Sequence, residues 1–248
     1  SLRSTSAKMP NELSDRSLWT VRDYRQRVEL PSAEEMLALE DSIPVPDGRK
    51  GLILLWRSQP CLVVSQLDAR LPTFHLAQLQ LQKEGWPISM RRSGGSAFPQ
   101  GPGILNVTVI TEADNEMAGT IEEGYRWFCG RCEQGLSELG IESTTASVEG
   151  SFCDGRYNLT VAGKKLAGTS QRWARRDGKV RKLFHCGILM NIDKQAVCTA
   201  VNHFYLQAGR DDSNADVVPD VIVNMSELID EPALSSVGDV LIKALAAE

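Results

Sequence analysis

Short apolar runs and amphipathic stretches alternate along most of the chain. Apolar runs bounded by turn residues predict strands at 51–56, 61–65, 87–92, 104–110, 144–148, 157–161 and 183–190. Apolar residues at helical spacing predict helices at 77–84, 121–139, 194–206 and 234–247. Ser32 is followed three residues later by Glu35, the sequence of a capping box, so a further helix is expected to begin there.

The order of these elements indicates the fold class. Strands and helices interleave without a strict β-α-β alternation, which predicts an α+β fold with a mainly antiparallel sheet. Residues 1–19 are polar, and we expect them to be a loose N-terminal segment. No interior stretch is long or flexible enough to serve as a linker, so residues 20–248 are expected to form a single domain.

Composition excludes several classes of protein. Of 248 residues, 42% are hydrophobic and 24% are charged, which is ordinary for a globular protein and argues against disorder, collagen and coiled coil. The longest apolar runs have the length of a strand, so no membrane-spanning helix is expected. The first residues lack the apolar core of a secretory signal, which favours a cytoplasmic location.

The six cysteines stand at 61, 129, 132, 153, 186 and 198. They are too sparse for a disulfide scaffold, and we expect reduced thiols. Cys129 and Cys132 have C-x-x-C spacing but lie on one face of the predicted helix, and no second pair or histidine cluster completes a metal site. A packing role is favoured, with a metal or redox role as the alternative.

Charge is distributed unevenly. The chain has 27 basic and 32 acidic side chains, for a net charge of −5, yet the segment from Ser151 to Lys182 contains nine basic residues and two acidic ones. This basic segment indicates an anionic partner, such as a phosphate-bearing cofactor, a nucleic acid or an acidic protein surface. A solvated hairpin is the alternative. Nucleic acid is disfavoured because the net charge is −5 and because, between Lys164 and Lys182, Trp173 is the only aromatic residue among the bases.

Two segments have residues suited to chemistry. Ser93, Gly94 and Gly95 follow paired arginines at the end of a predicted strand, and adjacent glycines allow backbone N–H groups to form an anion-binding nest. Cys153 lies in a polar loop with Arg156 three residues later and a Lys-Lys turn beyond. Nearby cations favour the thiolate, which is the nucleophilic form.

The motifs resemble a known superfamily. Arg-Arg-Ser-Gly-Gly at 91–95, Gly-Lys-Lys-Leu-Ala-Gly at 163–168 and His-Cys-Gly-Ile-Leu at 185–189 together resemble the lipoate–protein ligases, octanoyltransferases and biotin–protein ligases. The resemblance extends from about residue 37 to residue 205. It implies a central mixed sheet flanked by helices, as in the catalytic domain of those enzymes.

Within that superfamily, the loop Gly-Ser-Phe-Cys at 150–153 is most similar to the cysteine-dependent octanoyltransferases that act between lipoyl-domain proteins. The resemblance implies that Cys153 and Lys165 are catalytic, with Lys165 at the acyl carbonyl. It implies substrate binding by Arg91, Arg92, Ser93, Gly94, Gly95, Gly168 and His185. His185 also fits a packing role at the start of a strand, and Cys186 is an alternative nucleophile. No metal ligand is implied.

The expected activity is therefore transfer of an octanoyl or lipoyl group, through a cysteine thioester, to a lysine of a lipoyl-domain protein. The resemblance implies partners such as glycine cleavage H protein and the acyltransferase subunits of 2-oxoacid dehydrogenases, and no required cofactor. The ligases usually have a histidine shortly after the glycine loop, where this chain has Phe-Pro-Gln at 98–100. An ATP- and Mg²⁺-dependent lipoate ligase and a non-catalytic acyl- or carrier-binding module remain alternatives.

Overall fold

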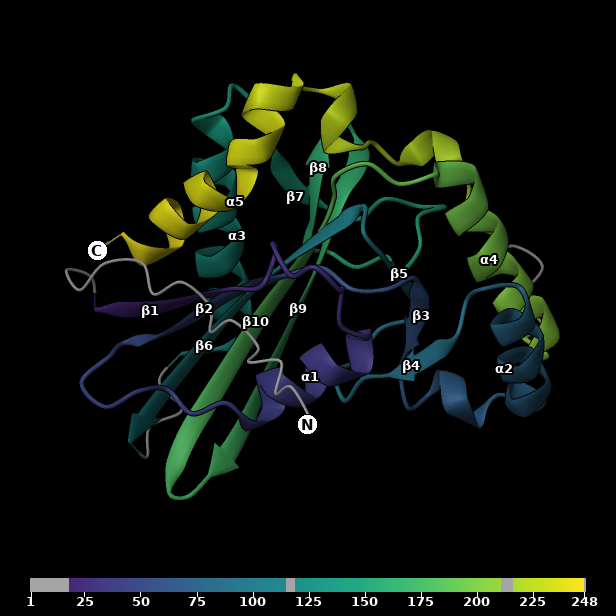
Figure 1. Cartoon of the computed structure of the whole chain (residues 1–248), viewed down its shortest axis with the longest axis horizontal. Helices are drawn as coiled ribbons and strands as arrows, with labels where there is room; N and C mark the ends of the chain where they lie inside the picture. The colour runs from purple at the N-terminus through teal and green to yellow at the C-terminus, as the bar shows by residue number, and fades with distance from the viewer. Residues whose placement is uncertain (1–17, 115–118, 211–215, 248) are drawn as a thin grey trace, which may run out of the picture.

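The computed structural model describes residues 18–114, 119–210 and 216–247, and its larger sheet has seven strands (Figure 1). These strands are β1 (Trp19–Asp23), β2 (Gly51–Trp56), β6 (Ile104–Asp114), β7 (Thr144–Ala146), β8 (Asn158–Val161), β9 (Lys164–Arg176) and β10 (Lys179–Leu189). Their order across the sheet is β1-β2-β6-β10-β9-β8-β7. Only the β1–β2 pair is parallel among these pairings, so the sheet is mixed and mainly antiparallel, as predicted.

A second sheet has three strands, in the order β4 (Ile88–Met90), β3 (Cys61–Val64) and β5 (Phe98–Gln100). The runs at 51–56 and 61–64 are close in sequence, but they belong to different sheets. Both are buried along their whole length, so burial alone gives no sign of this division. Pro99 fits β5 because that strand lies at an edge, where a missing N–H donor is tolerated.

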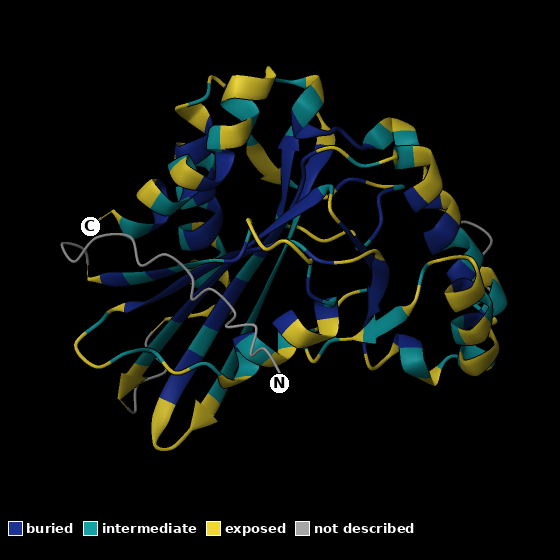
Figure 2. Cartoon of the chain, in the orientation of Figure 1, coloured by how far each residue is buried: buried dark blue, intermediate teal, exposed yellow. Residues whose placement is uncertain are grey.

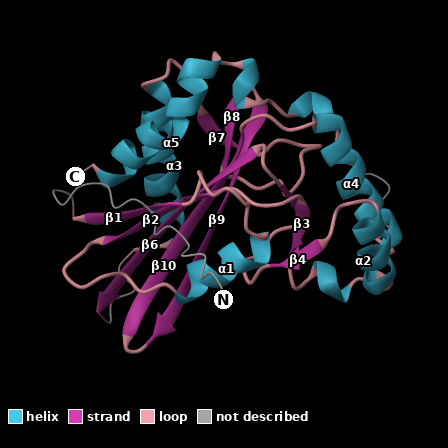
Figure 3. Ribbon diagram, in the orientation of Figure 1, coloured by secondary structure: helices cyan, strands magenta, loops and turns pink. Residues whose placement is uncertain are grey.

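The helices are α1 (Ala33–Ser42), α2 (Phe74–Lys83), α3 (Ile121–Ser137), α4 (Lys194–Gln207) and α5 (Glu231–Ala246), with 3₁₀ turns at 68–70, 219–221 and 225–227 (Figure 3). The predicted capping box of α1 is present: the Glu35 amide donates to Ser32 Oγ at 3.1 Å, and Glu35 Oε2 accepts from the Ser32 amide at 2.7 Å. The boundaries of the predicted helices are therefore close to the observed ones.

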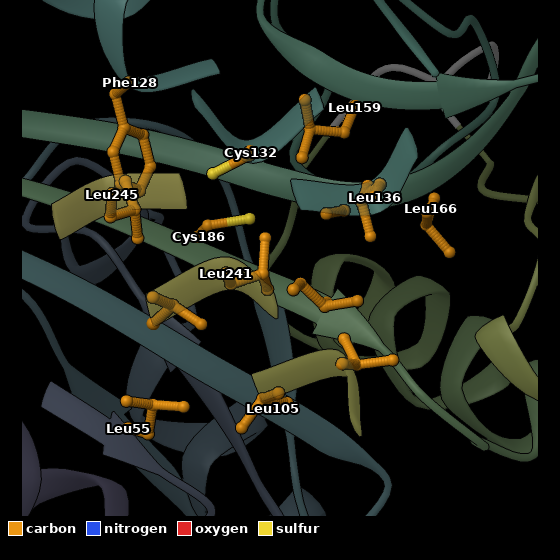
Figure 4. Close-up of a cluster of buried hydrophobic side chains, with 14 of the residues drawn as sticks. Leu55, Leu105, Phe128, Cys132, Leu136, Leu159, Leu166, Cys186, Leu241 and Leu245 are labelled. Carbon is orange, nitrogen blue, oxygen red and sulfur yellow. The ribbon is translucent and has the colours of Figure 1, made fainter. Parts of the chain in front are cut away.

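The three largest apolar clusters join the layers, and their strands are the most continuously buried parts of the chain (Figure 2). The largest lies between the seven-stranded sheet and the pair α3–α5, where Phe128 and Leu136 meet Leu241 and Leu245 (Figure 4). The second cluster joins the small sheet to α2 and α4. The third packs α1 through Met36 onto the larger sheet.

The predicted strand at 183–190 is part of a much longer hairpin. Strands β9 and β10 pair from Ile188 with Ala167 outward to Lys179 with Arg176, and they project from the sheet in Figure 1. A turn at Asp177 and Gly178, both with positive φ, connects them. His185 therefore lies within β10, not at the start of a strand, which corrects that expectation.

Arginines of this hairpin hold the carboxyl end of α1. That helix has no basic residue in its last turn, and its final carbonyl groups carry partial negative charge. Arg181, which is 4% exposed, donates to the carbonyl oxygens of Glu40 and Ile43, each at 2.7 Å. Arg172 forms an ion pair with Asp41, and Arg176 donates to the Asp41 carbonyl at 3.0 Å. Part of the basic segment is thus internal to the fold.

The structure describes only residues 18 and 19 of the N-terminal segment that was predicted to be loose. Residues 1–17 of the expected loose segment lie outside the described residues, whereas Trp19 begins β1 and is buried. Among the helices of the described residues, none has the length and apolarity needed to cross a lipid bilayer.

Candidate functional site

A cavity of about 650 Å³ lies where the glycine loop, the Cys153 loop, α1 and the β9–β10 hairpin meet. The sequence-predicted residues that line it are Arg91, Arg92, Ser93, Gly94, Gly95, Cys153, Gly168 and His185. Segments separated by more than ninety positions in the sequence therefore contribute to one site. A volume of this size suits a small-molecule group with an apolar body.

Cys153 lies in the connection between β7 and β8 with φ of +46°, in the left-handed region that residues with a Cβ rarely adopt. The following residue fixes the loop, because Asp154 Oδ1 accepts from the Val148 amide at 2.8 Å and from Asn158 Nδ2 at 2.6 Å. Cys153 is the one partly exposed cysteine of the six. This loop therefore presents the thiol to the cavity in a constrained conformation.

Lys165 lies behind the Cys153 loop. Its side chain is 0% exposed, and Nζ donates to the carbonyl oxygens of Phe152 at 2.6 Å and Cys153 at 3.0 Å. Burial lowers the pKa of Lys165 to about 8. The neighbouring Lys164 is exposed, as expected for adjacent residues of a strand. Lys165 thus contacts the backbone of Cys153, whereas the resemblance implies a place at the acyl carbonyl.

The side chain of Arg91 folds back under the glycine loop. Its Nε donates to the Gly94 carbonyl at 3.2 Å, and Nη2 donates to the Ser96 carbonyl at 2.7 Å and to Cys153 Sγ at 3.4 Å. Arg92 instead points outward, with 73% of its side chain exposed, and lies 3.8 Å from Asp41. The two adjacent arginines therefore have different surroundings.

An aromatic residue packs against two glycines beside the thiol. Gly168 of β9 is paired in register with Gly187 of β10, and the ring of Phe98 lies over both. A Cβ atom at Gly168 would approach this ring to 2.7 Å, and one at Gly187 to 2.9 Å. Phe98 also packs edge-to-face on Phe152, with ring centroids 5.3 Å apart. Phe98 therefore forms an apolar part of the cavity wall.

His185 belongs to a polar network in the same wall. Its Nε2 lies 3.0 Å from Asn106 Oδ1, and its Nδ1 lies 3.0 Å from Thr108 Oγ1 and 3.3 Å from Glu40 Oε1. Glu40 is 3% exposed and accepts from Trp56 Nε1 at 2.8 Å. Both ring nitrogens are therefore occupied by neighbouring side chains, which supports the packing interpretation of His185 even though it borders the cavity.

Comparison with known proteins places this site in a family. The model of the lipoyl protein ligase A/B catalytic domain matches residues 33–246. The chain belongs to this family. Its glycine loop, Cys153 loop, β9 and β10 all fall within the matched residues, so the family assignment covers the whole cavity.

Curated relatives share the family and a more specific name. An octanoyl-[GcvH]:protein N-octanoyltransferase of Kyrpidia tusciae is 34% identical over 184 residues, covering 70% of this chain and 62% of the relative. A protein of the same name from Geobacillus kaustophilus is 30% identical over 230 residues, covering 89% of this chain and 79% of the relative. The chain thus spans less than two thirds of the first relative and about four fifths of the second.

Solved structures of the family share the fold. A bipartite lipoate protein ligase from Thermoplasma acidophilum is 21% identical, with a TM-score of 0.60 over 88% of this chain and 79% of that one. Lipoate-protein ligase A bound with ATP is 19% identical, with a TM-score of 0.61 over 85% of this chain and 76% of that one. At these identities the likeness establishes the fold alone.

The other five cysteines of this family member are buried. Cys132 and Cys186 lie side by side in the core (Figure 4), and a hydrogen bond with Cys186 together with burial raises the pKa of Cys132 well above its usual value. Burial also raises the pKa of Cys61 and Cys198 to about 11, and that of Cys129 to about 12. These environments disfavour the reactive thiolate.

Sequence reasoning missed several residues of the wall. The sequence indicated Phe98 only as a departure from a ligase motif, and it gave Glu40 and Asp41 no role, although all three line the cavity. Tyr125 of α3 stacks on Tyr157 with ring centroids 4.2 Å apart, and both line the cavity. The glycines at 168 and 187 were the available signal for Phe98, because paired glycines on adjacent strands leave room for a large side chain.

Proposed function

We propose that this chain transfers an octanoyl group from glycine cleavage H protein to a lysine of a second lipoyl-domain protein, with Cys153 as the nucleophile. The observation that carries the proposal is the placement of one partly exposed thiol, held in a constrained loop, at a cavity large enough for an eight-carbon chain. The names of the curated relatives support the acyl group and the donor.

The proposed reaction has two balanced steps. The Cys153 thiolate attacks the carbonyl carbon of the donor's octanoyl-lysine amide, the C–N bond breaks, and the leaving amine takes up one proton. The neutral amine of the acceptor lysine then attacks the thioester, the C–S bond breaks, and one proton is released as the thiolate returns. The sum consumes no proton, nucleotide or metal ion.

Residues around Cys153 have distinct proposed tasks. Both steps pass through a tetrahedral oxyanion, and we assign the backbone N–H groups of the glycine loop at 93–95 as its donors, because Gly95 lies against the thiol. Lys165 fixes the carbonyl groups on the opposite side of the loop and supplies a buried positive charge. Phe98 and the glycines beneath it provide apolar surface for the acyl chain.

The exposed part of the basic segment is proposed to orient the protein partners. Arg156, Lys164, Arg175 and Lys179 remain exposed, Lys182 packs over the ring of Trp173, and the other bases of the segment are buried or hold α1. Lipoyl domains of the partners implied by the family resemblance are generally acidic around the target lysine. Exposed positive charges on Arg156, which borders the cavity, and on the β9–β10 hairpin would steer such domains towards Cys153.

An assay of octanoyl transfer without nucleotide tests the function. The purified chain is mixed with octanoylated glycine cleavage H protein and an unmodified lipoyl domain, and the acceptor is followed by intact mass. Transfer that requires Cys153 and no ATP supports the proposal. Transfer only with free octanoate, ATP and Mg²⁺ would identify a ligase, and no transfer under either condition would identify a binding module.

A further inference from the structure

The guanidinium group of Arg91 contacts the sulfur of Cys153. Arg91 Nη2 lies 3.4 Å from Sγ, although the two residues are 62 positions apart in sequence. The bonds from Arg91 to the carbonyl oxygens of Gly94 and Ser96 hold the group in place. The sequence instead indicated Arg156 and the Lys-Lys turn as the cations near this thiol, and Arg156 lies near the ring of Tyr157, at 5.7 Å from its centroid.

Gly95 makes this contact possible. A Cβ atom at this position would lie 2.8 Å from Arg91 Nη2 and 2.8 Å from Cys153 Sγ, which is too close for either atom. Gly95 also has φ of +99°, a conformation that residues with side chains disfavour. The arginine, the glycine and the cysteine therefore fit together as one packed unit within the cavity wall.

Charged or titratable groups of four other residues also lie near the Cys153 thiol. Lys165 lies on the carbonyl side of Cys153, and Asp154 accepts from two donors of its own loop. The phenol of Tyr125 and the exposed Arg156 border the same cavity. Among these groups, Arg91 is the cation that contacts the sulfur, and a guanidinium group cannot accept the thiol proton.

We propose that Arg91 is a catalytic residue that stabilises the Cys153 thiolate by direct charge contact, so that the nucleophile is activated electrostatically and not by a general base. The role of Arg91 in catalysis rests on the proposed function, whereas its effect on the Cys153 thiolate does not. His185 does not serve as the general base for the thiol, because its two ring nitrogens face Asn106 and Thr108. The same guanidinium stabilises the leaving thiolate in the second acyl transfer.

The pH dependence of Cys153 alkylation tests this role without any acyl substrate. The full chain and its variants react with iodoacetamide between about pH 5 and pH 10, and modification of Cys153 is followed by peptide mass. We expect Arg91→Met to move the midpoint of the rate profile upward by about 1 to 2 pH units, as for loss of an opposite charge within contact distance. Alkylation at neutral pH then slows about tenfold or more.

Three comparisons make the result specific. Arg91→Lys retains a positive charge and should recover most of the shift, whereas Arg156→Met removes an exposed charge that water screens and should leave the midpoint nearly unchanged. Equal rates for the wild type and Arg91→Met at high pH would show that the thiol remains accessible in the variant. A changed high-pH rate with an unchanged midpoint would overturn the proposal, because Arg91 would then act only on loop structure.

The result of this alkylation experiment is independent of whether the chain transfers an octanoyl group. An unshifted midpoint in Arg91→Met, or an equal shift in Arg156→Met, overturns the role of Arg91 even if Cys153 forms an octanoyl adduct. A shifted midpoint supports that role even if the chain transfers no octanoyl group. A second measurement uses a small octanoyl thioester, whose reaction with Arg91→Met should be slow at neutral pH and recover at high pH.

Discussion

The Nζ atom of Lys165 lies 3.0 Å from the carbonyl oxygen of Cys153, so the buried lysine is bonded to the backbone of the proposed nucleophile. Arg91 contacts the same residue through its sulfur. Cys153 is thus held between two cations that act on different atoms. The lysine stabilises the left-handed backbone, and the arginine faces the reactive thiol.

Replacing Lys165 by Met should reduce octanoyl transfer by roughly 10²-fold or more, because the Cys153 loop loses its fixed geometry and the site loses a buried positive charge. Lys164→Met is the matched control, since Lys164 is exposed on the opposite side of the strand. Turnover is measured with saturating carrier proteins. Similar losses in the two variants would show that the lysines contribute only diffuse charge.

The stability of the chain should depend on pH through Lys165. Its folded-state pKa of about 8 lies below the ordinary value of 10.5, so burial of the charge destabilises the fold fully below about pH 8. This penalty is relieved as the pH rises towards 10.5. Between about pH 8 and pH 10.5, the free energy of unfolding of the wild type should therefore rise by roughly 3 kcal/mol at most relative to that of Lys165→Met. Urea titrations at several pH values measure the difference, and a constant difference would contradict it.

Charge reversal on the β9–β10 hairpin should weaken the binding of protein partners more than it slows the acyl-transfer reaction itself. We expect Arg175→Glu with Lys179→Glu to raise the KM for an acidic acceptor domain and to weaken its salt dependence, because exposed charges steer partners over about 8 Å. Arg176 is left intact because it bonds to α1. Lys83→Glu on α2 is the control. Equal slowing of acylation by a small uncharged thioester would place the reversed residues in the reaction site.

The packing of Phe98 against paired glycines gives a stability prediction. Gly168→Ala should destabilise the fold by about 1–3 kcal/mol, because the new Cβ would overlap the Phe98 ring. In a Phe98→Ala background the same substitution should cost much less. Gly130→Ala in α3 has open space around its Cβ and should be neutral or stabilising by up to about 1 kcal/mol. Denaturant titrations of these variants measure the coupling.

Local sequence signals predicted most elements. Apolar runs marked the central strands, and the capping box at Ser32 and Glu35 marked the start of α1. Strand β9 and the first residues of β10 were not predicted, and residues 172–182 of this hairpin are rich in bases and lack an apolar alternation. Those bases are ordered by tertiary contacts, such as Arg181 with the last carbonyls of α1, and no local pattern records them.

Most of the residues predicted for the site line one cavity, but the sequence did not predict their geometry. The glycine loop, Cys153, Gly168 and His185 do share one cavity, as the family motifs implied. The contact between Arg91 and Cys153 depends on two loops from different sheets, so spacing along the chain gives no sign of it. Lys165 likewise turns towards the backbone of the cysteine loop because of how β9 packs beneath that loop.

The most direct test of the central claim is the intact mass of the chain after incubation with octanoylated glycine cleavage H protein in the absence of ATP. The account predicts a mass gain of one octanoyl group that hydroxylamine removes, present in the wild type and in Cys186→Ala and absent from Cys153→Ser. An adduct that persists in Cys153→Ser, or octanoyl transfer to the acceptor by a Cys153→Ser variant, would contradict a thioester on Cys153.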